Sequence, residues 1–265
     1  MANSLGDRKR HEATSKILLP RRSYVIIRID GCHFHTYTKG FQKPFDETII
    51  EDKQLYRIAK QNAYWKQGFK LRNDAMQTST QYVCENAQGC KIGYVQSDEA
   101  SFLLTDFDEL TTDAWYDNQL QKLVSVAASM FTAVFNFRIE PKEGKFATFD
   151  TRAFVLPDRV EVMNYFLWRI KDAERNSLAG LCQANYSHKE LLNKNASQQQ
   201  EMLFQKGINW NDVDETLKRG VWLHKPFWKN ELQVDGSKIP LSDAWEIEAA
   251  PRDKEEILKL IPTKE

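Results

Sequence analysis

Three acidic side chains and one glycine in this chain have the types and positions needed to hold a divalent cation. Asp30 and Gly31 follow an apolar run of β-branched residues, and Asp98 and Glu99 lie between two further apolar runs. Carboxylate oxygens and a backbone carbonyl, here that of Gly31, are ligands that Mg²⁺ prefers. Two such ions can activate an attacking hydroxyl and stabilise a leaving pyrophosphate. We therefore expect Asp30, Gly31 and Asp98 to bind metal, and all three carboxylates to take part in catalysis.

The residues around these acids suit a bound nucleoside triphosphate. Backbone N–H groups from Gly31 to His35 can form an anion-binding nest, and Lys43 offers a point charge for phosphate. Phe34 or His35 can stack on a base. The candidate nucleotide-binding residues are Gly31, Cys32, His33, Phe34, His35, Lys43, Asp46 and Ser97. Taken singly, each acid is also typical of a turn or a helix cap and His33 of a packing or surface position, so the hypothesis depends on the combination.

The segments that must position these residues predict an α+β fold. A buried strand is expected over 24–29, and a hairpin of strands 92–96 and 100–104 puts Asp98 at or next to its bend. Further elements are predicted as helices over 48–66, 74–85 and 113–136 and a strand over 147–156. This order is that of an α+β fold or a βαββαβ, ferredoxin-like antiparallel sheet flanked by helices.

The second half of the chain is predicted to be mostly helical. Helices are expected over 160–181, 187–192, 197–204 and 211–218, followed by a hairpin of 221–228 with 231–234. The tail from Trp245 is charged, and we expect it to be only partly ordered. We therefore divide the chain into a catalytic domain with an N-terminal arm, 1–156, and a helical C-terminal region, 157–265, that packs on it.

The composition predicts a soluble globular protein with a substantial core. Lys plus Arg and Asp plus Glu balance at 37 each in 265 residues, so no global basic signature indicates nucleic acid, although a local basic face is compatible with this balance. No apolar run approaches the ~18 residues of a membrane span, and the polar segment 1–11 lacks the apolar core of a secretion signal. The four cysteines lack metal-ligand spacing and are typical of free thiols in a reducing compartment. We expect a cytoplasmic protein without a membrane partner.

Five motifs, in this order along the chain, resemble those of the tRNA-histidine guanylyltransferase superfamily. They are R-I-D-G-x-x-F-H at Arg28–His35, K-P-x-D at Lys43–Asp46, Q-S-D-E-x-S at Gln96–Ser101, F-D-x-R at Phe149–Arg152 and W-R-x-x-D at Trp168–Asp172. The resemblance spans residues 4–204. It implies a domain similar to the palm of polymerases that adds nucleotides to the 5′ end of a tRNA in the 3′-to-5′ direction. The 5′-monophosphate is activated by ATP or GTP, the 3′-hydroxyl of an incoming nucleoside triphosphate attacks it, and two Mg²⁺ ions serve both steps.

The resemblance also implies roles for single residues. Asp30 and Asp98 match the metal carboxylates, with Gly31 supplying a carbonyl and Glu99 contributing beside them. Ser97 matches the serine before the metal aspartate. The positions that surround the activating nucleotide are matched by Phe34, His35, Lys43 and Asp46. Arg28 and Arg152 match cations that face the active site or the RNA, or that form a structural salt bridge.

Two departures from the motifs favour one branch of the family. The eukaryotic branch continues from W-R-x-x-D with C-H-I-N-N-L-Y-N, a segment linked to recognition of tRNA-histidine. This chain has Glu174 at the histidine position and keeps only Asn176 and Leu178. Cys32 replaces a basic residue that many members have after D-G. The features are similar to those of the bacterial and phage-type branch, whose members perform template-dependent repair of 5′-truncated tRNAs. A dedicated tRNA(His) guanylyltransferase that adds G-1 is the alternative.

RNA contact is expected from local basic clusters, because lysine and arginine bind phosphate without sequence preference. The candidates are Arg8, Lys9, Arg21, Arg22, Arg28, Arg152, Asn176 and Lys189. The resemblance implies tRNA and nucleoside triphosphates as partners and a homotetramer, a dimer of dimers, as the assembly. Two other classes of protein stay open: a palm-type nucleotide cyclase that acts on free nucleoside triphosphates, and a non-catalytic tRNA-binding protein.

Overall fold

The computed structural model describes residues 13, 15–38, 68–139, 144–225, 231–234, 237–240 and 245–264, with the backbone alone for 68–74 and for the last two strands before 245. The strands are β1 (Tyr24–Gly31), β2 (Cys90–Gln96), β3 (Glu99–Leu104), β4 (Phe149–Leu156), β5 (Val221–His224), β6 (Glu231–Val234), β7 (Ser237–Pro240) and β8 (Glu246–Ala249). The helices are α2 (Phe34–Tyr37), α4 (Gly68–Asn86), α5 (Leu120–Arg138), α6 (Arg159–Asn185), α7 (His188–Leu191), α8 (Ala196–Gln205), α9 (Glu215–Arg219) and α10 (Lys254–Leu260), with 3-10 turns at Trp115–Asn118 and Trp210–Asp212.

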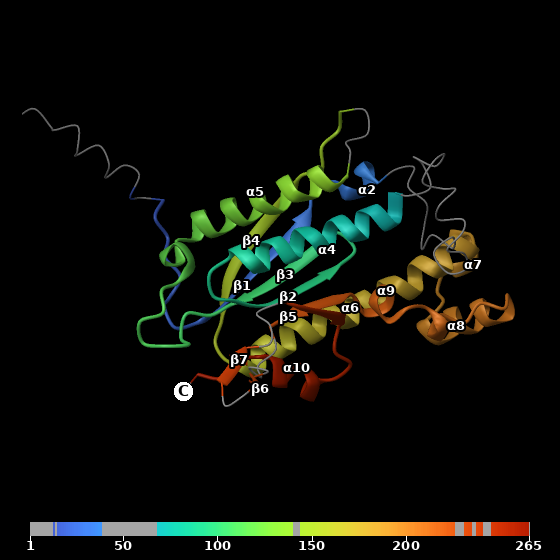
Figure 1. Cartoon of the computed structure of the whole chain (residues 1–265). Helices are drawn as coiled ribbons and strands as arrows, with labels where there is room; N and C mark the ends of the chain where they lie inside the picture. Colours follow the sequence, from blue (N-terminus) through green and yellow to red (C-terminus); the bar gives the residue numbers. More distant parts are fainter. Residues whose placement is uncertain are drawn as a thin grey trace, which may run out of the picture.

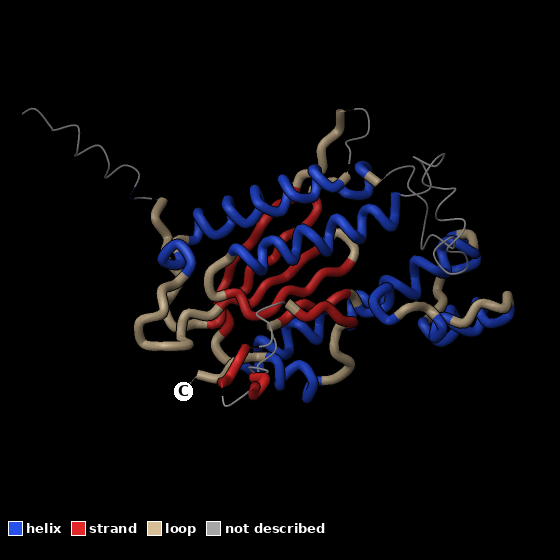
Figure 2. The backbone as a smooth tube through the Cα atoms, in the orientation of Figure 1, coloured by secondary structure: helices blue, strands red, loops and turns tan. Residues whose placement is uncertain are grey.

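One antiparallel sheet forms the centre of the fold, in the strand order β4-β1-β3-β2-β5-β8. Helices α4 and α5 cover one face, and α6 and α10 cover the other (Figures 1 and 2). The first four strands follow the predicted βαββαβ order, with α4 before β2 and α5 before β4. The predicted α+β fold with an antiparallel sheet and flanking helices is therefore confirmed. The helix expected over 48–66 lies outside the described residues, and α4 begins at Gly68 rather than at 74.

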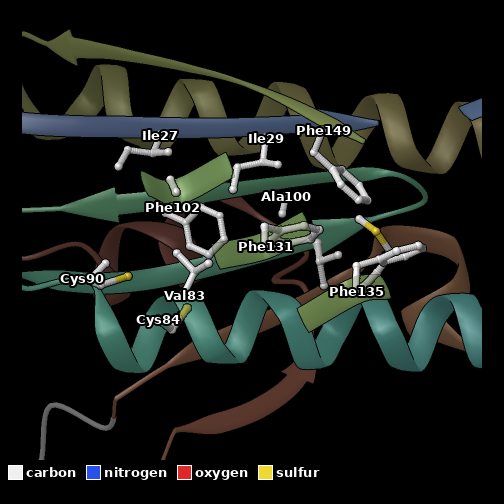
Figure 3. Packing of buried hydrophobic residues seen from close by; sticks show 14 of the residues in the cluster. Ile27, Ile29, Val83, Cys84, Cys90, Ala100, Phe102, Phe131, Phe135 and Phe149 are labelled. Atoms are coloured by element: carbon white, nitrogen blue, oxygen red, sulfur yellow. The ribbon is translucent and has the colours of Figure 1, made fainter. Parts of the chain in front are cut away.

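Alternation along β1 decides which face of the sheet carries the acids. Ile27 and Ile29 pack under α4 and α5, where Figure 3 shows them with Phe102 and Phe131. Ile26 belongs to the core under α6. Because residues two apart in a strand share a face, Arg28 and Asp30 lie on the α6 face of the sheet, at the end where β1 stops.

Helix α5 corrects one expectation from composition. By length and composition alone it is long and apolar enough to cross a membrane, so the prediction that no apolar run reaches this length is wrong. Its buried side chains are Leu123, Ala127, Phe131 and Phe135, one every helical turn. They pack on the sheet with β1 and β4. These four side chains attach α5 to the sheet face that it shares with α4.

Two expectations for the C-terminal part are wrong. Strand β5 does not form a hairpin with β6; it lies between β2 and β8, and β6 pairs with β7. The tail from Trp245 forms β8 and α10, because Ile257 and Ile261 bury their side chains in the core under α6. Both isoleucines stand among charged residues, so the composition of this segment does not indicate that it is buried. The domain boundary at 156 stays a prediction, and β5 and β8 extend the sheet of the first part.

Helix α6 connects the sheet to the helical extension. Its first half packs across the sheet, and its second half carries Leu178, Leu181 and Cys182 into a small separate core with Leu203 of α8. Asp158 caps its N-terminus by accepting a hydrogen bond from the Glu161 N–H. Arg169, near the middle of α6, contacts Glu99 of β3, so this part of the helix passes the end of the sheet that carries Asp30.

Candidate active site

The predicted metal carboxylates lie next to each other at one end of the sheet. Antiparallel pairing places Asp30 of β1 opposite Glu99 of β3, and the Gly31 N–H donates to the Asp98 carbonyl oxygen at 3.0 Å. Asp98 lies in the two-residue turn between β2 and β3, where Ser97 has a φ of 56°. The Asp30 side chain is 33% exposed. The structure thus gathers these predicted residues where β1 ends beside the β2–β3 turn, at an accessible end of the sheet, while their roles stay predictions.

A third carboxylate, Asp150, lies beside this pair. Strand β4 places Asp150 opposite Asp30 on the other side of β1, so their side chains share a face. Burial raises the pKa of the Asp30 carboxyl, the Arg28 guanidinium lowers it, and the negative charges of Asp98 and Asp150 raise it further. Asp150 was not among the predicted site residues, although it stands in the F-D-x-R motif and within the strand predicted over 147–156.

This donor set fits a magnesium ion that keeps part of its water shell. Mg²⁺ is usually held by one or two carboxylates, waters and substrate phosphates rather than by a protein cage. In the part of the chain that the structure describes, no group of three or more His, Cys, Asp and Glu side chains could form such a cage. Burial is the main cause of the raised pKa of Asp30, and the negative charges of Asp98 and Asp150 raise it further. A cation on Asp30, Asp98 and the Gly31 carbonyl would offset these charges.

Glu99 belongs to a buried ion cluster rather than to the accessible end of the sheet that carries Asp30 and Asp98. Its carboxylate accepts two hydrogen bonds of 2.7 Å from Nε and Nη2 of Arg169 on α6, and Arg28 Nη2 lies 2.5 Å from Oε2. Glu99 is 8% exposed. Burial raises its pKa, and the Arg169 and Arg28 charges lower it. Because arginines engage both carboxylate oxygens, we interpret Glu99 as a positioning residue, which differs from the predicted catalytic role.

Arg28 connects this cluster to Asp30, and Arg169 connects it to α6. Arg28 also lies 3.2 Å from Asp30 and is largely buried, so it follows the salt-bridge alternative rather than the predicted contact with RNA. Arg169 lies 3.4 Å from Asp172, one turn further along α6. Arg169 was missed as a site residue, although the W-R-x-x-D motif contains it.

Phe34 is a core residue, which corrects its prediction as a stacking group. It is 4% exposed, and its ring packs against those of Tyr37, Phe135 and Phe149, with centroids 5.1 to 5.6 Å apart. A Cβ on Gly31 would lie 2.3 Å from the Phe34 ring. The glycine is therefore needed for the approach of this ring, whatever ligand its carbonyl holds.

Gly31→Ala is expected to lower the free energy of unfolding by about 1–3 kcal/mol, because the new methyl overpacks the Phe34 ring. Urea denaturation at 25 °C measures this loss. In a Gly31→Ala/Phe34→Leu double variant the smaller side chain gives way, so the double variant should lose less stability than the sum of the single ones. A Gly31→Ala variant as stable as the wild type would contradict the close approach.

The other predicted nucleotide-binding residues have mixed environments. His33 is exposed with a φ of 52°, and its carbonyl accepts from the Thr36 N–H as α2 begins. His35 is exposed, and Cys32 is a half-buried free thiol. Lys43 and Asp46 lie outside the described residues. His35 thus remains available for stacking, whereas Phe34 does not.

The predicted RNA-binding residues are not gathered in one place. Arg21 pairs with Asp106 at 2.7 Å before β1 begins, roughly 20–25 Å of strand from Asp30, and Arg22 follows it. Arg152 is exposed on β4, on the same face as Asp30. Asn176 donates to the Asp172 carboxylate at 3.2 Å. Lys189 is exposed on α7, and Arg8 and Lys9 lie outside the described residues.

Comparison with known proteins gives a consistent set of relatives. The family described as "Thg1: tRNAHis guanylyltransferase" matches residues 7–63 and 65–157. A solved bacterial tRNA(His) guanylyltransferase (Thg1)-like protein in complex with ATP is 38% identical, with 97% of this chain and 99% of that chain covered and a TM-score of 0.77. A complex with GTP of a protein so described is 37% identical over the same shares, with a TM-score of 0.72. The tRNA(His) guanylyltransferase of Schizosaccharomyces pombe is 29% identical over 82% of this chain and 79% of its own length.

Proposed function

Because the chain belongs to the tRNA(His) guanylyltransferase family, we propose that it is a nucleotidyltransferase that extends the 5′ end of tRNA in the 3′-to-5′ direction. A 5′-monophosphate first attacks the α-phosphate of ATP or GTP and releases pyrophosphate. The 3′-hydroxyl of an incoming nucleoside triphosphate then attacks the activated 5′ phosphate and releases the nucleoside monophosphate. The observation that carries the proposal is the convergence of Asp30 and Asp98 at one end of the sheet.

The acids at this end of the sheet support a magnesium requirement. Asp30, Asp98 and the Gly31 carbonyl would hold the metal, and Mg²⁺ bound there would favour the ionised hydroxyl and neutralise charge on the phosphates. Arg28 keeps the Asp30 carboxylate oriented through its 3.2 Å contact. The bacterial relatives solved with ATP and with GTP support nucleoside triphosphates as substrates.

Repair of 5′-truncated tRNA is favoured over dedicated addition of G-1 to tRNA(His). The observation is Glu174, an acid at the histidine position of the eukaryotic segment, where its carboxylate pairs with Lys171 at 2.9 Å. An acid repels RNA phosphate, so this surface of α6 is poorly suited to the contact that the eukaryotic histidine makes. Pairing with the template strand then selects the nucleotide that is added.

The proposal is tested with 5′-monophosphorylated tRNAs that are full-length or lack their first nucleotide, each nucleoside triphosphate in turn, and Mg²⁺. We expect addition to the truncated tRNAs of the nucleotide that pairs with the opposing base, and a changed product when that base is changed. Addition of G to full-length tRNA(His) alone would identify the dedicated enzyme instead. A cyclic nucleotide formed without RNA, or tRNA binding without turnover, would contradict the proposed activity.

A further inference from the structure

Trp168 of α6 presents an aromatic ring to solvent beside the ion cluster, and neither the fold nor the carboxylates explain its exposure. The residue is 54% exposed. The Arg169 guanidinium carbon lies over its ring, 4.5 Å from the centroid, and the Tyr165 ring meets it edge-on with centroids 6.3 Å apart. Large aromatic side chains gain most of their free energy from burial. A tryptophan that two neighbours hold in an exposed position is therefore a candidate surface for contact with a ligand.

The groups behind the ring hold it in place. Arg169 is fixed by its two 2.7 Å hydrogen bonds to Glu99, and the Tyr165 hydroxyl lies 2.8 Å from that of Ser101 on β3. Tyr165 is buried and Arg169 is largely buried, and both connect α6 to the sheet. A flat group that stacks on Trp168 would meet a preorganised surface and would immobilise few additional side chains.

The ring also lies on the face of the sheet that carries the acids. Ser101, which contacts Tyr165, is opposite Arg28 on β1, and Arg28 is opposite Arg152 on β4. The Arg152 side chain is 63% exposed, with its nearest carboxylate, Asp150, 3.8 Å away. Arg152 and Trp168 thus lie on the same side of the sheet, and an accessible cation together with an exposed ring can bind an unpaired nucleotide, with phosphate on the cation and base on the ring.

We propose that Trp168 stacks on a nucleobase of the substrate, with Arg169 as the cation on the opposite side of the ring. This inference rests on the proposed function, because a nucleobase beside this edge belongs either to the RNA end or to a nucleoside triphosphate. Stacking does not depend on which base is present, so Trp168 adds affinity without adding sequence preference. That agrees with choice of nucleotide by template pairing.

The test measures dissociation constants of the full chain for 5′-monophosphorylated tRNA and, separately, for a non-hydrolysable ATP analogue. Trp168→Leu keeps apolar bulk and loses the ring. We expect it to weaken one or both ligands by about 5- to 150-fold, and the affected ligand identifies the source of the base. Trp168→Phe should keep most of the affinity. Phe137→Leu is the matched control, an exposed aromatic on α5 across the sheet, and should change neither constant.

Equal binding of both ligands by Trp168→Leu and wild type would overturn the inference, as would an equal loss in the Phe137→Leu control. Melting temperatures show whether each variant is folded. If Trp168→Leu melts early, Trp168→Gln replaces it, because glutamine suits an exposed helical position. Nucleotide addition by the wild type is measured in parallel. Its absence would refute the proposed function, whereas its presence with unaffected binding in Trp168→Leu would refute only the role of Trp168.

Discussion

Replacing Asp30 or Asp98 by asparagine is expected to reduce nucleotide addition to tRNA by about 10³-fold. Asparagine keeps the size of the side chain but removes the negative charge that a divalent cation needs. Asp30 lies at the end of β1 and Asp98 lies in the β2–β3 turn, and the two segments are joined by the hydrogen bond from the Gly31 N–H to the Asp98 carbonyl oxygen. Each substitution should therefore be as damaging as the other, and single-turnover addition with 5′-triphosphorylated tRNA measures the second step alone.

The same substitution at Asp30 should not harm the fold. Burial and neighbouring acids raise the pKa of Asp30 on folding. Above this raised pKa the ionised carboxylate costs folding free energy, and below the unfolded-state pKa the cost is absent. Asparagine carries no charge at any pH, so Asp30→Asn should melt at the same or a higher temperature at neutral pH. Arg28 keeps Glu99 as its partner in this variant.

Asp108→Asn is the control for the loss of a carboxylate. Asp108 pairs with Lys91 near the start of β2, at the opposite end of the sheet from the β2–β3 turn. Its substitution should leave nucleotide addition unchanged. If Asp30→Asn or Asp98→Asn retained activity close to that of Asp108→Asn, the proposed metal site would be wrong.

The position of these acids could be predicted because it depends on local pattern. The β-branched run before Asp30 predicts a buried strand that ends there, and the predicted strands 92–96 and 100–104 give a hairpin with Asp98 at or next to its bend. The βαββαβ order then places the hairpin beside the strand, and the sheet confirms it. Alternation also decides that Asp30 and Arg28 share a face.

The neighbours of these acids could not be predicted in the same way, because they come from distant segments. Arg169 is 70 residues from Glu99, and no local pattern relates the two. Phe34 stands in a polar motif next to two histidines, yet it is buried, because the α2 turn directs its ring toward α5. Strand β5 pairs with β2 and β8. This pairing depends on the position of the whole C-terminal region, which no local sequence pattern specifies.

Glu99→Gln tests the ion cluster and is expected to lower the free energy of unfolding by about 3 kcal/mol. Burial raises the pKa of Glu99 as well, so the amide removes the cost of burying a carboxylate charge. It also leaves two largely buried guanidinium groups without their shared charge, and for a buried ion pair this second effect is the larger. Arg28 keeps Asp30 and Arg169 keeps Asp172, at 3.2 and 3.4 Å, so the loss should lie at the low end for a broken buried ion pair. Thermal unfolding should shift down by roughly 6–12 °C.

Two further variants separate this role from a direct one in catalysis. Glu174→Gln removes an acid from an exposed pair on the same helix and should change stability by less than about 0.5 kcal/mol. Arg169→Met combined with Glu99→Gln removes both charges, so the double variant should lose less stability than the sum of the single ones. If Glu99→Gln instead melts like the wild type and is inactive, Glu99 acts directly on metal or nucleotide. The Glu99–Arg169 pair joins β3 to α6, so a variant that breaks it should melt earlier than the wild type.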